Sequence, residues 1–465
     1  MEIIKDSKIF TLHDSFKLKG SDVEIPFGFT EISSCAFASD EYYDFFHIKS
    51  ITLPESVEVI QPNAFSVMCI ERIFISKNVR FIGYGAFCSC ENLTQIIIDS
   101  ENPYYVFADG NLYSKDFSVL HTCLPKKQLK CCSEQNSCSC KELTIPDHVR
   151  VIECDAFSNC KKLVKITIPE SVSEIRHKAF LACWDLQNIC VDSNNESYAS
   201  LDGVLFSKDM SILHTYPHAQ KGSSYDIPES VKTIGDGAFY SCSDLTSVKM
   251  PDKLEKIGES AFARCTGIES FSLPDSTQEI GDWAFYYCTG LSEINIPCGM
   301  TKLAHSVFSH CKGLKSIIIP DSVKLIDDYA LCKCESLTLV TLPEGVTRLG
   351  AWAFNSCINL EEISIPDSVT EIENHTFGFC LNLRKINFPK NLASIGQSAF
   401  HWCKKITDII IPETVTAIEW GAFIDCENLQ YAIIPDSVTE IDESVFRGCP
   451  KLTQIRGSES ASAEA

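Results

Sequence analysis

Long apolar stretches are missing from this chain: its 465 residues contain no run of about 18 uncharged apolar residues. The sequence therefore predicts no transmembrane segment and no membrane insertion. Residues 1–22 carry charges at Glu2, Lys5, Asp6 and Lys8 and lack the apolar core of a secretory signal. On the residues alone, the expected localisation is cytoplasmic by default.

Motifs for catalysis or cofactor binding are also lacking. The chain has no Gly-rich phosphate loop, no G-x-S-x-G elbow and no H-E-x-x-H pair. His121 and His214 stand at equivalent places in two similar segments, where a histidine of a repeated strand is expected to be packed or half-exposed. The remaining histidines have no cysteine, serine or carboxylate partner at a motif spacing. The sequence predicts a protein without enzymatic activity and without a cofactor.

Basic residues are in the minority, since 40 Lys and Arg face 62 Asp and Glu for a net charge of −22. Binding to phosphates requires clustered cations, so nucleic acid is excluded as the expected partner and anionic membrane surfaces are disfavoured. Basic ligands fit the charge better. The apolar share of 45% is that of an ordered globular chain, which excludes wholesale disorder.

What the chain has in abundance is repetition. Ten cysteines stand 23 residues apart without a slip: Cys242, Cys265, Cys288, Cys311, Cys334, Cys357, Cys380, Cys403, Cys426 and Cys449. A fixed period of this size is typical of a solenoid, in which each coil buries its apolar face only against its neighbours.

One repeat, Pro228–Met250, shows how a coil is expected to fold. Its proline suits a tight turn, and the pair Val231 and Ile234 follows at the spacing V-x-x-I. Residues 238–245 carry apolar side chains at helix-like spacing, which predicts one or two helical turns. Residues 248–250 alternate between inward and outward positions, as a short strand does, and such strands would pair in parallel between coils.

The repeated pattern I-P-[DE]-S-V-x-x-I-x-x-x-A-F-x-x-C-x-x-L-x-x-I resembles the BspA-type leucine-rich repeats of bacterial and protist surface proteins. The resemblance implies a right-handed, leucine-rich-repeat-like coil. It also implies an adhesion or interaction scaffold, at the cell surface or secreted, that binds protein or glycoprotein ligands such as host or matrix proteins. No catalytic residues are common to the family. An intracellular adaptor or assembly scaffold of the same fold is the alternative, favoured by the missing signal.

We expect an N-terminal cap at residues 1–22, one continuous solenoid at 23–456 and a disordered tail at 457–465. Two insertions, at about 99–145 and 192–225, interrupt the array. Asp99–Leu124 aligns without gaps with Asp192–Pro217, and both copies keep Asp-Gly, Ser-Lys-Asp and Leu-His-Thr. Because these are turn residues between short apolar runs, each insertion is predicted to form a β-hairpin.

Binding is expected at outward strand positions, because the inward positions are committed to the core. The candidate strip is Lys249, Ser272, Asn295, Ile318, Leu339, Thr341, Ser364, Asn387, Ile410, Tyr431 and Ile433. Its apolar members would offer a rigid surface to an extended peptide or a protein edge, unless they cover another part of the coil. The aromatic residues of the first insertion are further candidates, unless that hairpin folds onto the coil: Tyr104, Tyr105, Phe107 and Tyr113.

The 25 cysteines allow three interpretations. The repeated column can fill a corner of each coil as small buried side chains, which is the interpretation we favour. It could instead form a disulfide ladder, although side chains of one column point the same way. Zinc binding by Cys131, Cys132, Cys138 and Cys140 is the third, but their spacing departs from the usual C-x2-4-C pairs, so no metal site is assigned.

Overall fold

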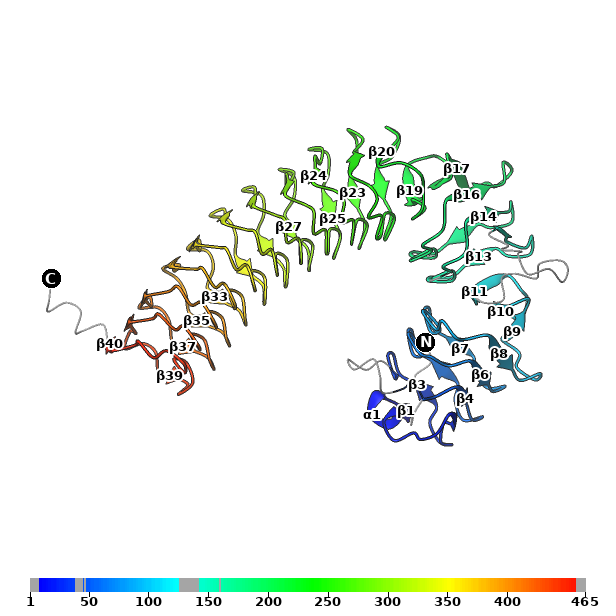
Figure 1. The fold of residues 1–465 in the computed structure, drawn as a ribbon, viewed down its shortest axis with the longest axis horizontal. Coiled ribbons are helices and arrows are strands. Elements are labelled where there is room, and N and C mark those ends of the chain that lie inside the picture. Colours follow the sequence, from blue (N-terminus) through cyan, green and yellow to red (C-terminus); the bar gives the residue numbers. More distant parts are fainter. Residues whose placement is uncertain (1–7, 38–44, 46, 125–141, 159, 457–465) are drawn as a thin grey trace. The chain divides into compact units, whose positions relative to one another are not determined.

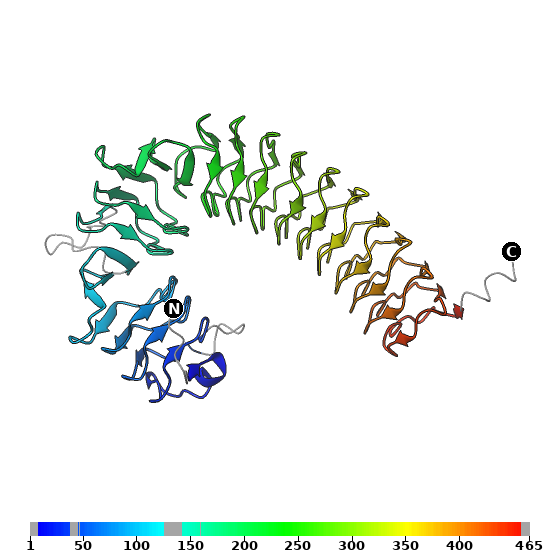
Figure 2. The ribbon, with the colours of Figure 1, turned by 180° about the vertical axis from the view of Figure 1, so that it is seen from behind.

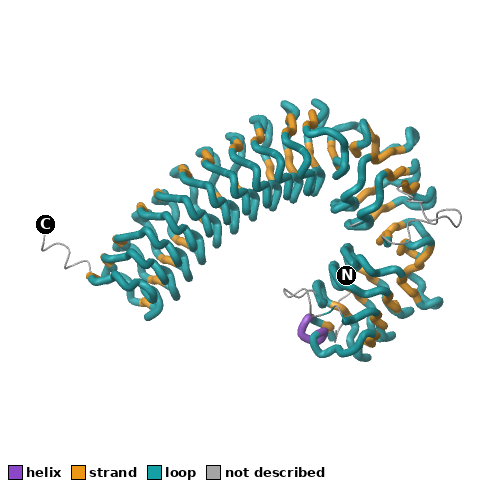
Figure 3. Tube along the Cα trace, viewed as in Figure 1, coloured by secondary structure: helices purple, strands orange, loops and turns teal. Residues whose placement is uncertain are grey.

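The computed structural model describes residues 8–37, 45, 47–124, 142–158 and 160–456, and it divides into two compact units, Met1–Lys221 and Gly222–Ala465. Each unit is a stack of coils in which short strands of successive coils lie parallel (Figures 1 and 2). Loops and turns make up most of each coil, and the one helix of the described residues is α1 (Leu12–Ser15) (Figure 3). The predicted solenoid is confirmed.

Two ladders of parallel strands run through the first unit. The outward ladder consists of β2 (Asp22–Glu24), β4 (Ser50–Thr52), β6 (Arg72–Ile75) and β8 (Gln95–Ile98), and later of β12 (Glu142–Thr144), β14 (Lys165–Ile168) and β16 (Asn188–Val191). The second ladder consists of β1 (Ile9–Phe10), β3 (Glu31–Ile32), β5 (Val59–Ile60) and β7 (Phe81–Ile82), and later of β13 (Val151–Ile152) and β15 (Glu174–Ile175). Strand β1 pairs with β3, so the predicted cap segment contributes a strand to the ladder.

Both predicted hairpins form. The first consists of β9 (Tyr105–Ala108) and β10 (Asn111–Ser114), and β10 also pairs antiparallel with β11 (Val119–Cys123). The second repeats this with β17 (Tyr198–Leu201), β18 (Val204–Ser207) and β19 (Ile212–Thr215). The Ser-Lys-Asp turn is held by Asp116, whose carboxylate accepts hydrogen bonds from the hydroxyls of Ser114 (2.6 Å) and Ser118 (2.8 Å). These bonds, that from Ser114 first, lower the pKa of Asp116 to about 2.

The second unit repeats its coils without insertion. The outward strands are β20 (Ser224–Asp226), β22 (Ser247–Lys249), β24 (Ser270–Phe271), β26 (Glu293–Ile294), β28 (Ser316–Ile318), β30 (Leu339–Thr341), β32 (Glu362–Ser364), β34 (Lys385–Asn387), β36 (Asp408–Ile410), β38 (Tyr431–Ile433) and β40 (Gln454–Arg456). The second ladder contains β21 (Thr233–Ile234), β23 (Lys256–Ile257), β25 (Glu279–Ile280), β27 (Lys302–Leu303), β29 (Leu325–Ile326), β31 (Arg348–Leu349), β33 (Glu371–Ile372), β35 (Ser394–Ile395), β37 (Ala417–Ile418) and β39 (Glu440–Ile441).

The segment around each Ala-Phe step is a run of turns, not the short helix predicted from its apolar spacing. Some of its N–H groups close turns within the coil, as when Cys357 donates to the carbonyl of Phe354 (3.1 Å). Others leave the coil, as when Phe354 donates to the carbonyl of Thr376 in the next coil (2.9 Å). The backbone is left-handed at Trp352 and Ser356 (φ 61° and 59°), and the N–H groups of both residues also bond to the next coil. Backbone N–H groups that would bond within a helix therefore bond between neighbouring coils.

Columns of phenylalanine and cysteine form the core of the second unit. Phe377 is fully buried, and its ring stacks on those of Phe354 and Phe400 with centroids 5.4 Å apart on each side. The buried thiol of Cys403 donates a hydrogen bond to the carbonyl of Phe377 (3.2 Å). The same bond, to the carbonyl 26 positions earlier, is made by Cys265, Cys288, Cys311, Cys334, Cys357, Cys380, Cys426 and Cys449. Burial raises the pKa of the column thiols from Cys242 to Cys403, to about 12 for Cys288. At the end of the column, a hydrogen bond with Cys426 lowers the pKa of Cys449. The described cysteines are free, so the packing interpretation holds and no disulfide ladder forms among them.

Within the part of the chain that the structure describes, no helix has the length and apolar character needed to cross a bilayer. The predicted tail at 457–465 and the cysteine cluster at 131–140 lie outside the described residues.

Candidate functional site

The predicted strip lies on the outward side of the second unit. Strand positions alternate as expected: in β28, Ile317 is buried while Ile318 is 78% exposed. Leu339 and Ile410 are each 61% exposed, and Tyr431 and Ile433 are half-buried. The remaining members are exposed polar or charged residues, namely Lys249, Ser272, Asn295, Thr341, Ser364 and Asn387.

Register divides the apolar members of the strip into two patches. Ile410 pairs directly with Ile433, whereas Ile318 pairs with Thr341. Ser364 and Asn387 lie on the coils between the patches and bond to each other, with the Asn387 amide donating to the Ser364 hydroxyl (2.8 Å). The strip is therefore two apolar patches with a polar stretch between them, rather than one continuous apolar surface.

The aromatic residues of the first insertion do not form an exposed patch. Tyr105 and Tyr113 are 6% and 2% exposed, Phe107 is half-buried, and Tyr104 alone of the four is exposed, at 46%. The prediction of a shared contact surface fails for the two buried tyrosines because they belong to the core. The sequence pattern could not separate the inward and outward faces of a hairpin that packs on a coil.

Tyr105 closes the end of a ladder. Strand β7 has no following strand, and the Tyr105 hydroxyl takes its place by accepting a hydrogen bond from the N–H of Ile82 (2.9 Å) and donating to the carbonyl of Arg80 (3.4 Å). In the second insertion, the Tyr198 hydroxyl accepts from the N–H of Ile175 in β15 in the same way (2.7 Å). The duplicated tyrosines are structural.

The duplicated histidines pack on these tyrosines. His121 meets Tyr105 edge to face with ring centroids 5.2 Å apart, and His214 meets Tyr198 at the same distance. Burial lowers the pKa of both imidazoles, to about 4 for His121. This environment explains why both copies keep a histidine without assigning it a catalytic role.

The low pKa of His121 predicts a loss of stability in mild acid. The unfolded chain takes up a proton near pH 6.5, whereas the folded chain resists it until about pH 4, so stability falls as pH falls through this window. We expect the free energy of unfolding to drop by about 2–3 kcal/mol from this group. Denaturant unfolding at pH 7 and pH 4.5 measures the drop. It should be smaller in His121→Gln and smallest in His121→Gln/His214→Gln; equal drops in all three proteins would contradict the prediction.

A row of rings in the second unit escaped the sequence analysis. We call it the ring track: Trp283, His305, Tyr329, Trp352, His375 and His401. Tyr329 and Trp352 stack at 5.7 Å, and Trp352 and His375 at 4.0 Å. Trp283, Tyr329, Trp352 and His375 stand two positions before the repeat phenylalanine or its Leu331 equivalent, which is a sequence signal, whereas His305 and His401 depart from this spacing. Two of the five ring pairs are stacked and three meet edge to face, and each pair joins neighbouring coils.

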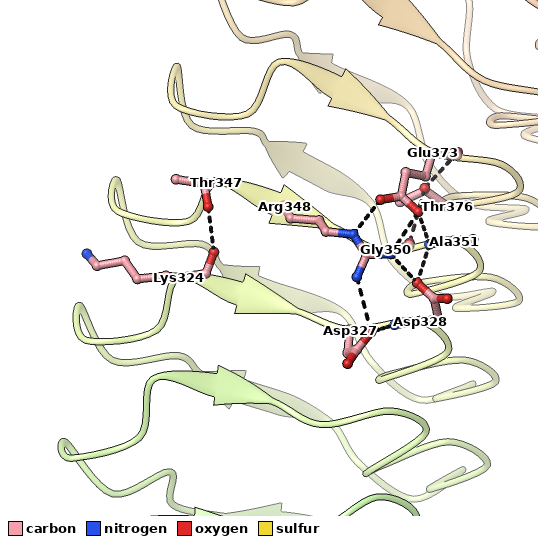
Figure 4. Close-up of polar contacts among 9 residues, drawn as sticks. All are labelled: Lys324, Asp327, Asp328, Thr347, Arg348, Gly350, Ala351, Glu373 and Thr376. Atoms are coloured by element: carbon pink, nitrogen blue, oxygen red, sulfur yellow. Dashed lines mark hydrogen bonds and ion pairs between the residues drawn. The ribbon is translucent and has the colours of Figure 1, made fainter.

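Arg348 links three successive coils of the second unit (Figure 4). Its guanidinium donates to Asp327 (3.1 Å), Asp328 (2.7 Å) and Glu373 (Nε–Oε1 2.6 Å). The hydrogen bond to Glu373, and then the charges of the acidic partners, raise the pKa of the Arg348 guanidinium above its usual value. The carboxylates of Asp328 and Glu373 also accept the N–H of Ala351, at 3.1 and 3.0 Å. Every carboxylate in this cluster thus already has a partner, which marks it as a structural clamp.

No group of three histidine, cysteine or acidic side chains among the described residues is placed to hold a metal ion. The four cysteines of the candidate zinc cluster, Cys131, Cys132, Cys138 and Cys140, are not among those residues.

Comparison with known families agrees with the coil geometry. The model of the BspA-type leucine-rich repeat region matches residues 15–134, 128–214, 214–338 and 324–453, and so nearly the whole chain. The chain belongs to the BspA-type leucine-rich repeat family. This family and its fold are those of repeat scaffolds. No curated protein matches the chain.

Among solved structures, a leucine-rich repeat protein from Eubacterium ventriosum is 19% identical, with a TM-score of 0.51 over 82% of this chain and 90% of that one. At this identity the likeness shows a shared leucine-rich repeat fold alone. A leucine-rich cell surface protein from Faecalibacterium prausnitzii is 25% identical over 77% of this chain and 96% of that one (TM-score 0.46). The pneumococcal vaccine antigen PcpA is 22% identical over 90% and 85% (TM-score 0.35).

Proposed function

We propose that this chain is a non-enzymatic interaction scaffold that binds protein or glycoprotein ligands, such as host or matrix proteins, through its outward strand positions. The observation that supports the proposal is the exposure of Ile318, Leu339 and Ile410, each above 60%, on strands held in register by the core. Large apolar side chains on a rigid outward face are typical of protein contact sites. The adhesion role fits the cell surface relative named above.

Two variants test the strip. Ile318→Glu and Ile410→Glu place a charge in each apolar patch at an exposed position, so the fold should remain intact while binding weakens at least tenfold. The measurement is surface capture of immobilised extracellular-matrix proteins by purified full-length protein. Thr370→Glu is the matched control, since it adds the same charge at an exposed position of the second unit outside the strip and removes no apolar surface.

Binding that survives both isoleucine variants would reject the strip as the contact surface. Failure of the wild type to bind any matrix protein would reject adhesion itself. Tyr104 is the exposed aromatic residue of the predicted hairpin contacts, and Tyr104→Ser in the same assay shows whether the first hairpin takes part.

A further inference from the structure

A groove of about 660 Å³ lies on the outward face of the first unit, outside every site considered so far. It runs over strands β2, β4, β6 and β8 and the turns that follow them. Register places Glu24, Thr52, Phe74 and Ile97 in one row across these four strands. The half-buried side chains of Phe74 and Ile97 make its floor apolar.

Phe27 forms a wall of this groove with 82% of its surface exposed. The backbone beside it is fixed: Gly28 has a φ of 104°, which favours glycine, and its N–H donates to the hydroxyl of Ser56 (3.0 Å). A phenyl ring held in water by a constrained turn is available to a ligand at little ordering cost.

The rim of the groove is acidic. Glu24, Glu55 and Asp99 line it, and none of the described residues that line it is a lysine, arginine or histidine. The ammonium group of Lys77 approaches Glu55 at 3.6 Å. Within the described part of the chain, Glu24 has neither an ion pair nor a side-chain hydrogen bond. The groove therefore combines an apolar floor and wall with unneutralised negative charge.

We propose that this groove binds an extended protein segment in which large apolar side chains alternate with lysine or arginine. The apolar side chains would pack on Phe74 and Ile97. The cations would face Glu24 and Asp99, and one could lie over the ring of Phe27. Four strands about 4.8 Å apart span roughly 15 Å, which is the length of about four or five extended residues. This site is separate from the strip of the second unit, and its charge excludes anionic partners.

The test uses full-length protein and the fluorescein-labelled peptide Gly-Lys-Leu-Lys-Phe-Lys-Gly, with affinity measured by fluorescence anisotropy. This peptide should bind at least tenfold more tightly than versions with Glu in place of Lys, or with Ser in place of Leu and Phe. Glu24→Lys and Phe27→Ser should each raise the Kd at least tenfold. Both positions are exposed, and circular dichroism checks that the variants are folded.

Because the whole chain is strongly acidic, the control must separate the groove from general attraction. Glu344→Lys makes the same charge change at an exposed turn of the second unit and should leave the Kd unchanged. The proposal is overturned if Glu344→Lys weakens binding as much as Glu24→Lys, or if both groove variants bind like wild type. It is also overturned if peptide preference does not depend on charge and apolar content. Ile410→Glu should not affect this peptide, so the groove and the strip can fail independently.

Discussion

Replacing Phe377 with alanine is expected to lower the free energy of unfolding of the second unit by about 3–5 kcal/mol, because a fully buried ring is removed. The substitution removes packing contacts with both neighbouring coils, since the ring stacks on Phe354 and on Phe400 with interplanar angles of 9°. A coil of a solenoid has no other neighbours to compensate. Guanidinium unfolding followed by circular dichroism measures the shift in midpoint.

The chain itself supplies the control for this prediction. Leu331 occupies the position equivalent to Phe377 in another coil and is fully buried there. Phe377→Leu should therefore cost much less than Phe377→Ala, since leucine leaves a smaller cavity. A midpoint that is the same in Phe377→Ala as in wild type would show that the ring column is not what holds these coils together.

Asn195→Ala is the second change with a large expected effect, a loss of about 3 kcal/mol from the first unit. The side chain is fully buried, and its amide donates to the carbonyls of Pro169 (2.8 Å) and Val172 (2.9 Å). Its oxygen accepts from the N–H groups of Ser197 (2.9 Å) and Tyr198 (2.8 Å). Alanine would leave four backbone groups without these partners at the base of the second hairpin, and each buried unpaired group is costly.

Asn102 makes the same four contacts at the base of the first hairpin, so Asn102→Ala should destabilise to a similar degree. Asn194→Ala is the matched control, because Asn194 is the exposed neighbour and should change stability by less than about 0.5 kcal/mol. Thermal unfolding of the three variants gives the comparison. Equal melting temperatures for Asn195→Ala and Asn194→Ala would refute the role assigned to the buried amide.

Repetition explains why the strands of each coil and their parallel pairing could be predicted from the sequence. A single residue such as Val248 says little, but the same alternation every 23 residues identifies a buried strand position, and the structure pairs these strands in parallel. Turn residues likewise placed both hairpins correctly. The helix-like spacing at the Ala-Phe step misled the prediction, because turns within a coil produce the same spacing while other N–H groups bond to the next coil.

The outward surfaces could be predicted only where the repeat is strict. In the second unit, paired outward residues such as Ile410 and Ile433 are one repeat length apart, so the strip could be read from the chain. In the first unit, the row Glu24, Thr52, Phe74 and Ile97 has spacings of 28, 22 and 23 residues, and no fixed period brings its members together. The groove was missed for this reason.

The amino-acid sequence by itself determined the solenoid, its period, its two hairpins and the burial of its cysteine column, because each depends on a pattern that recurs from coil to coil. The tertiary structure alone decided which side chains face outward together. Tyr105 is buried and completes the hydrogen bonds at the end of a ladder, whereas Phe27 is exposed and lines a groove together with acidic residues. Such contacts depend on how unequal coils align, and chain spacing does not encode that alignment.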